Sequence, residues 1–273
     1  MVVMDTMRKL LASEFKRIIR YKSLWVVFAF ALGVIVFILI DMVMNPEPIV
    51  FVFAPSYLVD GNHDPVSMIY RPTGVNAINL TVNISFFILL PILFSILIAS
   101  EYPKGTLRDL ESQGYKKWTI YLSRLLSSWI VTFAIVSVLT LINAALASVL
   151  WGFSDGNVLW GRVVAFFFMG VLVLLALTSL AVFISSIIRR TGGAVALNIL
   201  FITLQSSGLL SIILPFGREF SASFDMTFAD IFRKMHTIPL DDYSYLGWAA
   251  LACLGYIIVT TAFGMFLIER RKL

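Results

Sequence analysis

The chain has 273 residues, of which 59% are hydrophobic and 14% charged, with a formal net charge of +5 and a mean hydropathy of +0.92. Soluble domains average about 45–50% apolar and about 25% charged residues, so this composition excludes an ordinary soluble domain. The single cysteine, Cys253, excludes a disulfide framework, and the basic residues are scattered over short segments, which argues against a nucleic-acid-binding surface.

The charged residues leave six long uncharged intervals, each of 18 to 30 residues. A membrane-spanning helix needs roughly 20 apolar residues to cross the hydrocarbon layer. The intervals therefore predict an all-α integral membrane protein, a single domain over 1–273, with six transmembrane helices. We place these spans at about 23–44, 76–100, 122–150, 163–188, 194–215 and 246–268.

The distribution of basic residues predicts the orientation of these spans. With six spans both termini face the same side, and that side then carries 16 of the 21 Lys and Arg residues. Short loops rich in Lys and Arg stay in the cytoplasm, so we expect both the N- and C-termini to be cytoplasmic.

Residues 7–22 have the pattern of an amphipathic helix that lies at the membrane surface and leads into the first span. Its apolar residues recur at steps of three and four, and most of its basic residues fall opposite them. The apolar set is Met7, Leu10, Leu11, Phe15, Ile18 and Ile19, and the basic set is Arg8, Lys9, Lys16, Arg17 and Arg20.

The polar residues expected inside the membrane are neutral amides and hydroxyls. The second span follows a proline-rich outer loop over 42–77 and contains Pro91, which should kink it. Such neutral groups either line a pathway or join helices, the latter at about 0.6 kcal/mol each. The candidates for lining a pathway are Asn79, Asn83, Thr203, Gln205 and Ser206.

Residues 99–118 form a compact charged segment between the second and third spans. Glu101 marks the point where the chain leaves the membrane, and Pro103 and Gly105 break the helix. Thr106 and Asp109 then favour a capped short helix over about 107–113, which Gly114 ends as its C′ residue. We expect a two-faced rod parallel to the membrane.

Two further connections are informative. The inner turn between the fourth and fifth spans covers only 189–193, so these two spans should be neighbours. The outer segment 216–245 contains phenylalanines at steps of four, which favours helices that re-enter the outer leaflet or cap the spans, with either a packing or a gating role. The candidate gate residues are Phe216, Phe220, Phe224 and Phe228.

The order of features around the inner segment resembles the permease subunits of type-2 ABC exporters. The resemblance rests on Glu101, Gly105-Thr106, Leu107, Leu110, Gly114 and Lys116-Lys117, set between the second and third of six spans. It implies that the short helix is a coupling helix, which docks in a cleft of a separate ATPase subunit. The coupling residues would then be Glu101, Gly105, Thr106, Leu107, Arg108, Leu110 and Gly114.

The resemblance also implies the partners and location of the chain. A second permease copy, identical or similar, would complete the pore in a bacterial cytoplasmic membrane, and two ATPases holding ATP and Mg²⁺ would drive export of an amphipathic or hydrophobic substrate, a peptide before a lipid or drug. This chain itself would hold no cofactor, because the sequence contains no phosphate-binding Gly-x-x-x-x-Gly-Lys-Ser/Thr loop.

Two other classes of function remain to be weighed. A non-transporting scaffold or sensor could recruit a cytoplasmic partner through the same inner segment. An enzyme is disfavoured because the sequence has no nucleophile elbow and no zinc-binding cluster, the two histidines His63 and His236 lying far apart in expected outer loops.

Overall fold

The computed structural model describes residues 2–44, 77–78, 89–102, 106–153, 160–188, 190–206 and 244–270. Within these residues the regular secondary structure is helical throughout. The helices are α1 (Val2–Arg20), α2 (Lys22–Met44), α4 (Leu89–Ala99), α5 (Thr106–Ser112), α6 (Lys117–Trp151), α7 (Trp160–Ile187), α8 (Thr191–Ser206) and α12 (Ser244–Arg270).

Four of these helices are long and apolar enough to cross a membrane, which supports the predicted all-α membrane class. The qualifying stretches are Lys22–Asp41, Lys117–Trp151, Val163–Ile187 and Leu246–Arg270. They coincide with the predicted first, third, fourth and sixth spans. The described parts of the second and fifth predicted spans form the shorter apolar helices α4 and α8, so their full lengths stay a prediction.

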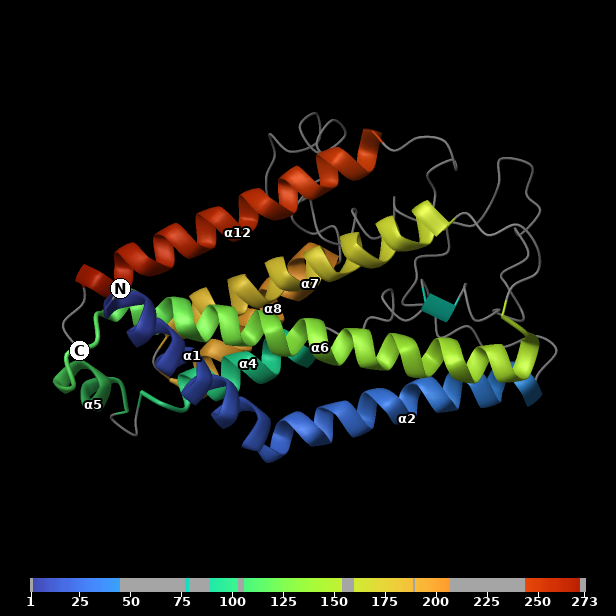
Figure 1. The fold of residues 1–273 in the computed structure, drawn as a ribbon, viewed down its shortest axis with the longest axis horizontal. Helices are drawn as coiled ribbons and strands as arrows, with labels where there is room; N and C mark the ends of the chain where they lie inside the picture. The colour runs from blue at the N-terminus through green and yellow to red at the C-terminus, as the bar shows by residue number, and fades with distance from the viewer. Residues whose placement is uncertain are drawn as a thin grey trace.

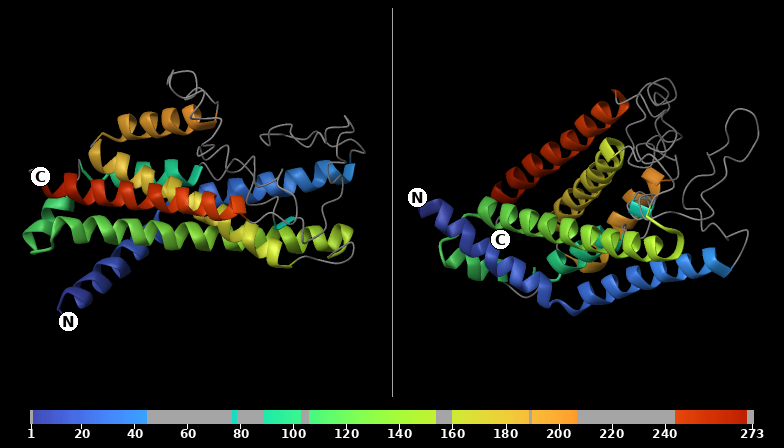
Figure 2. Two further views of the ribbon diagram at one scale, coloured as in Figure 1. Left: turned by 90° about the horizontal axis from the view of Figure 1, so that it is seen from above. Right: turned by 45° about the vertical axis from the view of Figure 1, so that its right-hand side comes forward.

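The long helices run roughly alongside one another, α2 and α6 in one direction and α7 and α12 in the opposite one (Figure 1). The start of α1, the short helix α5 and the end of α12 all lie at one end of the bundle, on the left in Figure 1. Figure 2 shows that α1 meets α2 at a bend and extends from there toward the same end. The two ends of the described chain therefore lie on the same side, as an even number of spans requires.

Helix α7 lies at the centre of the bundle and contacts α4, α6, α8 and α12. Its buried side chains surround the helix rather than forming one stripe, as expected for a helix enclosed by others. They include small and hydroxyl-bearing residues, which let helix backbones approach closely in a membrane bundle. The fully or nearly fully buried set includes Val173, Ala176, Thr178, Ser179, Ala181, Val182 and Ser185.

Helices α4, α7 and α8 share a buried cluster of three neutral polar side chains. Ser185 Oγ on α7 donates to Ser95 Oγ on α4 at 2.8 Å, and Asn198 Nδ2 on α8 donates to the same Ser95 Oγ at 2.9 Å. The contact of α7 with α8 confirms that the short inner turn makes these helices neighbours. Asn198 thus joins α8 to α4.

Ser95→Ala is expected to lower the free energy of unfolding by about 1 kcal/mol, because it removes one shared acceptor from two interhelical hydrogen bonds. Denaturant titration in detergent micelles measures this change. The matched control is Ser123→Ala, since Ser123 is equally buried but donates only to Ile120 O of its own helix among the described residues, at 2.8 Å. Equal losses in the two variants would contradict an interhelical role.

Two predicted outer features lie outside the described residues. The proline-rich loop over 42–77 is described only at its two ends, and the segment 216–245 only from Ser244 onward. The predicted gate residues fall in the part that is not described. They are Phe216, Phe220, Phe224 and Phe228.

Candidate functional site

The short helix α5 forms where the sequence predicts it, over Thr106–Ser112. Its end confirms the role of Gly114, which has a φ of 86°. The Gly114 N–H donates to Glu111 O at 2.9 Å and the Tyr115 N–H donates to Leu110 O at 3.2 Å. These two bonds make a Schellman motif, which satisfies the last carbonyls of the helix and turns the chain toward α6.

Among the side chains of α5 that the structure describes, the exposed ones are polar. Asp109, Glu111 and Ser112 are exposed, as is Gln113 directly after the helix, whereas Leu110 is half-buried. Glu111 Oε1 lies 3.2 Å from Lys117 Nζ at the start of α6. The helix therefore presents a charged surface to the space beyond the end of the bundle.

The segment that leads into α5 is tied to three other helices. The Glu101 carboxylate pairs with Arg124 on α6 and with Arg17 on α1. Tyr102 Oη donates to Ser186 O on α7 at 3.0 Å. Thr106, the first residue of α5, donates from its hydroxyl to Glu101 O at 3.3 Å. The root of α5 is thus connected to α1, α6 and α7.

Four side chains at this root close a ring of alternating charge, here called the ionic ring: Glu14, Arg17, Glu101 and Arg124. Glu14 pairs with Arg17 on the same helix. Arg124 Nε lies 3.7 Å from Glu14 Oε1, and this contact closes the ring. The side chains of Glu14, Glu101 and Arg124 are 5%, 6% and 3% exposed, and that of Arg17 is 36% exposed. The ring carries no net charge and joins α1, α6 and the end of α4.

Burial raises the pKa of the Glu101 carboxyl above its ordinary value, and the guanidinium groups of Arg124 and Arg17 oppose that shift by favouring the ionised form. A buried carboxylate is tolerated only where such partners surround it. Each buried charge of the ring lies between two charges of opposite sign, so its charge is compensated. Removing one member would leave each of its two neighbours with a single partner of opposite charge.

Helix α1 brings its two ring members to α6 through a buried stripe with a four-residue step. Leu10, Glu14 and Ile18 are 3%, 4% and 1% exposed and lie on one face of α1. Helix α1 covers most of the predicted amphipathic helix over 7–22 and buries Leu10 and Ile18, and its location at the membrane surface stays a prediction. Arg17, one of the basic residues expected mostly opposite the apolar set, is half-buried, lies three residues after Glu14 and reaches the ring.

The structure also changes the expected position of Glu101. The sequence places its carboxylate at the membrane surface as part of the segment that contacts a partner. The side chain is instead enclosed, so in this conformation it holds the root of α5 rather than its exposed face. Sequence reasoning missed Glu14, Arg17 and Arg124. Glu14 gives a usable signal, since it is an acidic residue between Leu10 and Ile18 on an apolar stripe.

The remaining predicted site residues are only partly described. The structure describes the backbone of Leu107 and Arg108 within α5, and that of Thr203, Gln205 and Ser206 within α8. Residues Gly105, Asn79 and Asn83 lie outside the described residues. Among the described residues, no group of three or more His, Cys, Asp or Glu side chains could hold a metal ion.

Comparison with known proteins gives one family. Residues 34–273 match a family described as "Protein of unknown function (DUF2705)". No curated protein matches the chain. The match begins within α2, so α1 and its two members of the ionic ring precede the matched region.

Proposed function

The chain belongs to the DUF2705 family, and we propose that it is the membrane-spanning subunit of an ATP-driven exporter, with α5 as the helix that receives force from a separate ATPase. The resemblance to exporter permeases is supported by a physical feature of the inner segment. That feature is the ion pair between Glu101 and Arg124, which closes the α4–α5–α6 hairpin at its base.

Force on α5 reaches the spans only if the connections at its root are stiff. A short helix on two loose linkers would swing without moving the helices on either side. Here the root is held by the pair with Arg124, by the hydrogen bond from Tyr102 to α7 and by the pair with Arg17. A push on α5 would therefore move α4, α6 and the inner end of α7 as a group.

The length of α6 suits this role. It has 35 residues, and at 1.5 Å per residue that corresponds to about 50 Å, against roughly 30 Å of hydrocarbon. Its first turns, which carry Arg124, can therefore extend past the hydrocarbon to meet α5. The substrate would be amphipathic or hydrophobic, with a peptide favoured, and the chain would act in a bacterial cytoplasmic membrane with both termini inside.

A second permease copy would complete the transport unit. Helix α8 exposes apolar side chains that no described residue covers, whereas the described part of α4 is largely buried. We propose that α8, the fifth predicted span, contacts the second copy, as one of the helices that, like α2 and α12, expose apolar side chains. Its exposed apolar residues are Leu197, Ile199 and Leu200.

Co-purification with a nucleotide-binding partner tests the proposal. Full-length tagged chain, extracted in mild detergent from its native membrane, is expected to bring down a protein with ATPase activity. Leu107→Asp and Asp109→Arg are each expected to reduce the recovered ATPase at least tenfold, because Leu107 is a predicted coupling residue and Asp109 is exposed on α5. Gln113→Asp is the matched control, since it adds the same charge as Leu107→Asp just beyond the helix, and it should leave recovery within about twofold.

Glu101→Gln separates docking from transmission in the same experiment. Because Glu101 is enclosed in the ionic ring, this variant is expected to retain the ATPase while losing transport in reconstituted vesicles. If wild-type chain recovers no ATPase under any mild extraction, the exporter proposal fails, and the alternative of a scaffold or sensor that recruits another cytoplasmic partner takes its place.

A further inference from the structure

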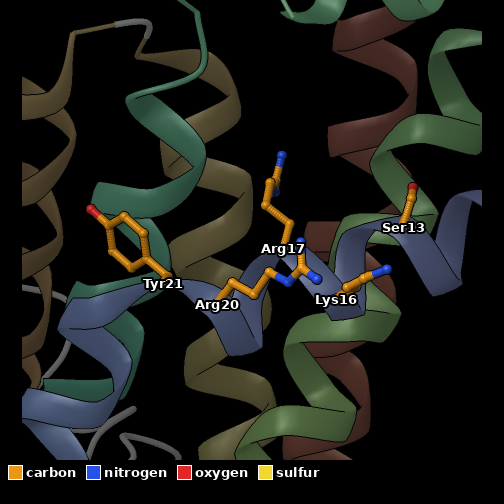
Figure 3. Close-up of a pocket in the computed structure, with 5 residues that line it drawn as sticks. All are labelled: Ser13, Lys16, Arg17, Arg20 and Tyr21. Carbon is orange, nitrogen blue, oxygen red and sulfur yellow. The ribbon is translucent and has the colours of Figure 1, made fainter.

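An open groove of about 480 Å³ lies along the C-terminal half of α1. It is lined by Ser13, Lys16, Arg17, Arg20 and Tyr21 (Figure 3). Three of these five residues carry a positive charge. The groove is therefore a basic surface feature, and none of the roles assigned so far to α1 uses it.

The three cations of the groove differ in how far their charge is compensated. Arg17 pairs with Glu14 and Glu101, and in Figure 3 it extends from α1 in a different direction from Lys16 and Arg20. Lys16 and Arg20 are exposed and form no ion pair with any described residue. Two uncompensated cations thus lie one turn apart on the same helix, which favours an anionic ligand.

The groove lies where a membrane-spanning helix begins. Helix α1 ends at Arg20 and the apolar helix α2 starts at Lys22. Trp25 Nε1 donates to Ile19 O at 2.8 Å, which holds the indole against the last turn of α1. Trp side chains favour the boundary between headgroups and hydrocarbon, so this turn lies at headgroup level if α2 spans the membrane.

Beyond that boundary, α2 exposes a row of large apolar side chains to its surroundings. Those nearest the groove in sequence are Trp25, Val26 and Phe30, which are 54%, 68% and 56% exposed. A ligand at this junction would therefore meet positive charge at one end and apolar surface at the other. A phospholipid has that same distribution of charge and apolar surface.

We propose that this groove binds the phosphate-bearing headgroup of an anionic phospholipid, with Lys16 and Arg20 as the charge partners and the acyl chains along α2. The site stands independently of the exporter proposal. Because Arg17 lines the groove and also belongs to the ionic ring, a bound headgroup would hold α1 in the position that keeps the ring closed.

Native mass spectrometry of the full chain in detergent tests the site, with phosphatidylglycerol and phosphatidylcholine titrated in turn. The chain is expected to bind phosphatidylglycerol more tightly. Lys16→Gln/Arg20→Gln should weaken that binding about 25-fold, on the basis of roughly fivefold for each cation near a charged lipid.

The control is Arg8→Gln/Lys9→Gln, which removes two exposed cations from the same helix outside the groove. It should change the affinity by no more than about twofold. An equal loss in the two double variants would overturn the site, because it would indicate diffuse attraction by the whole helix. So would equal affinity for phosphatidylcholine, or displacement of the lipid by millimolar inorganic phosphate, which would assign the groove to a free anion.

Discussion

Arg124→Met is expected to lower the free energy of unfolding by about 3–5 kcal/mol, the cost typical of removing one partner from a buried ion pair. Arg124 is 3% exposed and lies between Glu101 and Glu14 in the ionic ring. Methionine fills much of the same volume, so the loss arises from two buried carboxylates that keep only Arg17 as a partner. Denaturant titration in detergent micelles, followed by tryptophan fluorescence, measures it.

The double variant Glu101→Gln/Arg124→Met distinguishes a broken charge pair from a packing defect. Removing both charges leaves Glu14 paired with Arg17, so the double variant should be more stable than the sum of the two single losses predicts. We expect an interaction energy of about 1–3 kcal/mol, in the range found for residues in direct contact. Additive losses would show that the two side chains act separately.

Glu111→Gln is the matched surface control. Glu111 pairs with Lys117 at 3.2 Å, but its side chain is 42% exposed, and such surface pairs contribute about 0–1 kcal/mol. If Arg124→Met were no more destabilising than Glu111→Gln, the ring would not hold the root of α5, and the transmission route proposed above would lose its support.

The long helices could be predicted because charge alone locates them. The predicted spans over 122–150 and 163–188 correspond to α6 and α7, whose ends at Lys117–Trp151 and Trp160–Ile187 differ by five residues or fewer. The differences lie at the ends, where interfacial residues such as Lys117 and Trp118 continue the helix beyond the apolar run. A hydropathy pattern detects the hydrocarbon boundary, and a helix can extend past it.

The short helix α5 could be predicted for a different reason. Its limits are set by local chemistry, namely breakers at Pro103 and Gly105 and a residue at Gly114 that tolerates positive φ. Such signals act over a few residues and need no knowledge of packing.

The ionic ring could not be predicted in the same way, because its members come from sequence positions far apart. Glu101 and Arg124 are separated by 23 residues, and Glu14 and Arg17 belong to α1, near the start of the sequence. Considered by itself in the sequence, each of these four residues resembles an ordinary charged residue at the membrane surface. Only the packing of α1 on α6 shows that Glu14 is enclosed and that Arg17 reaches Glu101.

Gly264→Ala is expected to destabilise the chain by about 1–3 kcal/mol, through crowding at the contact between α12 and α6. A Cβ at Gly264 would lie within 3.0 Å of three atoms of the Tyr121 side chain, the hydroxyl oxygen and two ring carbons, among them Cε2 at 2.9 Å. Tyr121 is 1% exposed and its hydroxyl donates to Thr260 O at 3.3 Å, so the ring has no free space to enter. Thermal unfolding in detergent measures the loss.

Gly255→Ala provides the control on the same helix, since a Cβ there meets nothing within 4 Å. It should be neutral or stabilising by up to about 1 kcal/mol, because alanine is the better helix former. Gly264→Ala/Tyr121→Leu should recover stability relative to Gly264→Ala, whereas Tyr121→Phe should not, because the ring carbons remain. Tyr121 lies one turn before Arg124 on α6, so recovery would show that this close approach fixes α12 against the same end of α6 that holds the ionic ring.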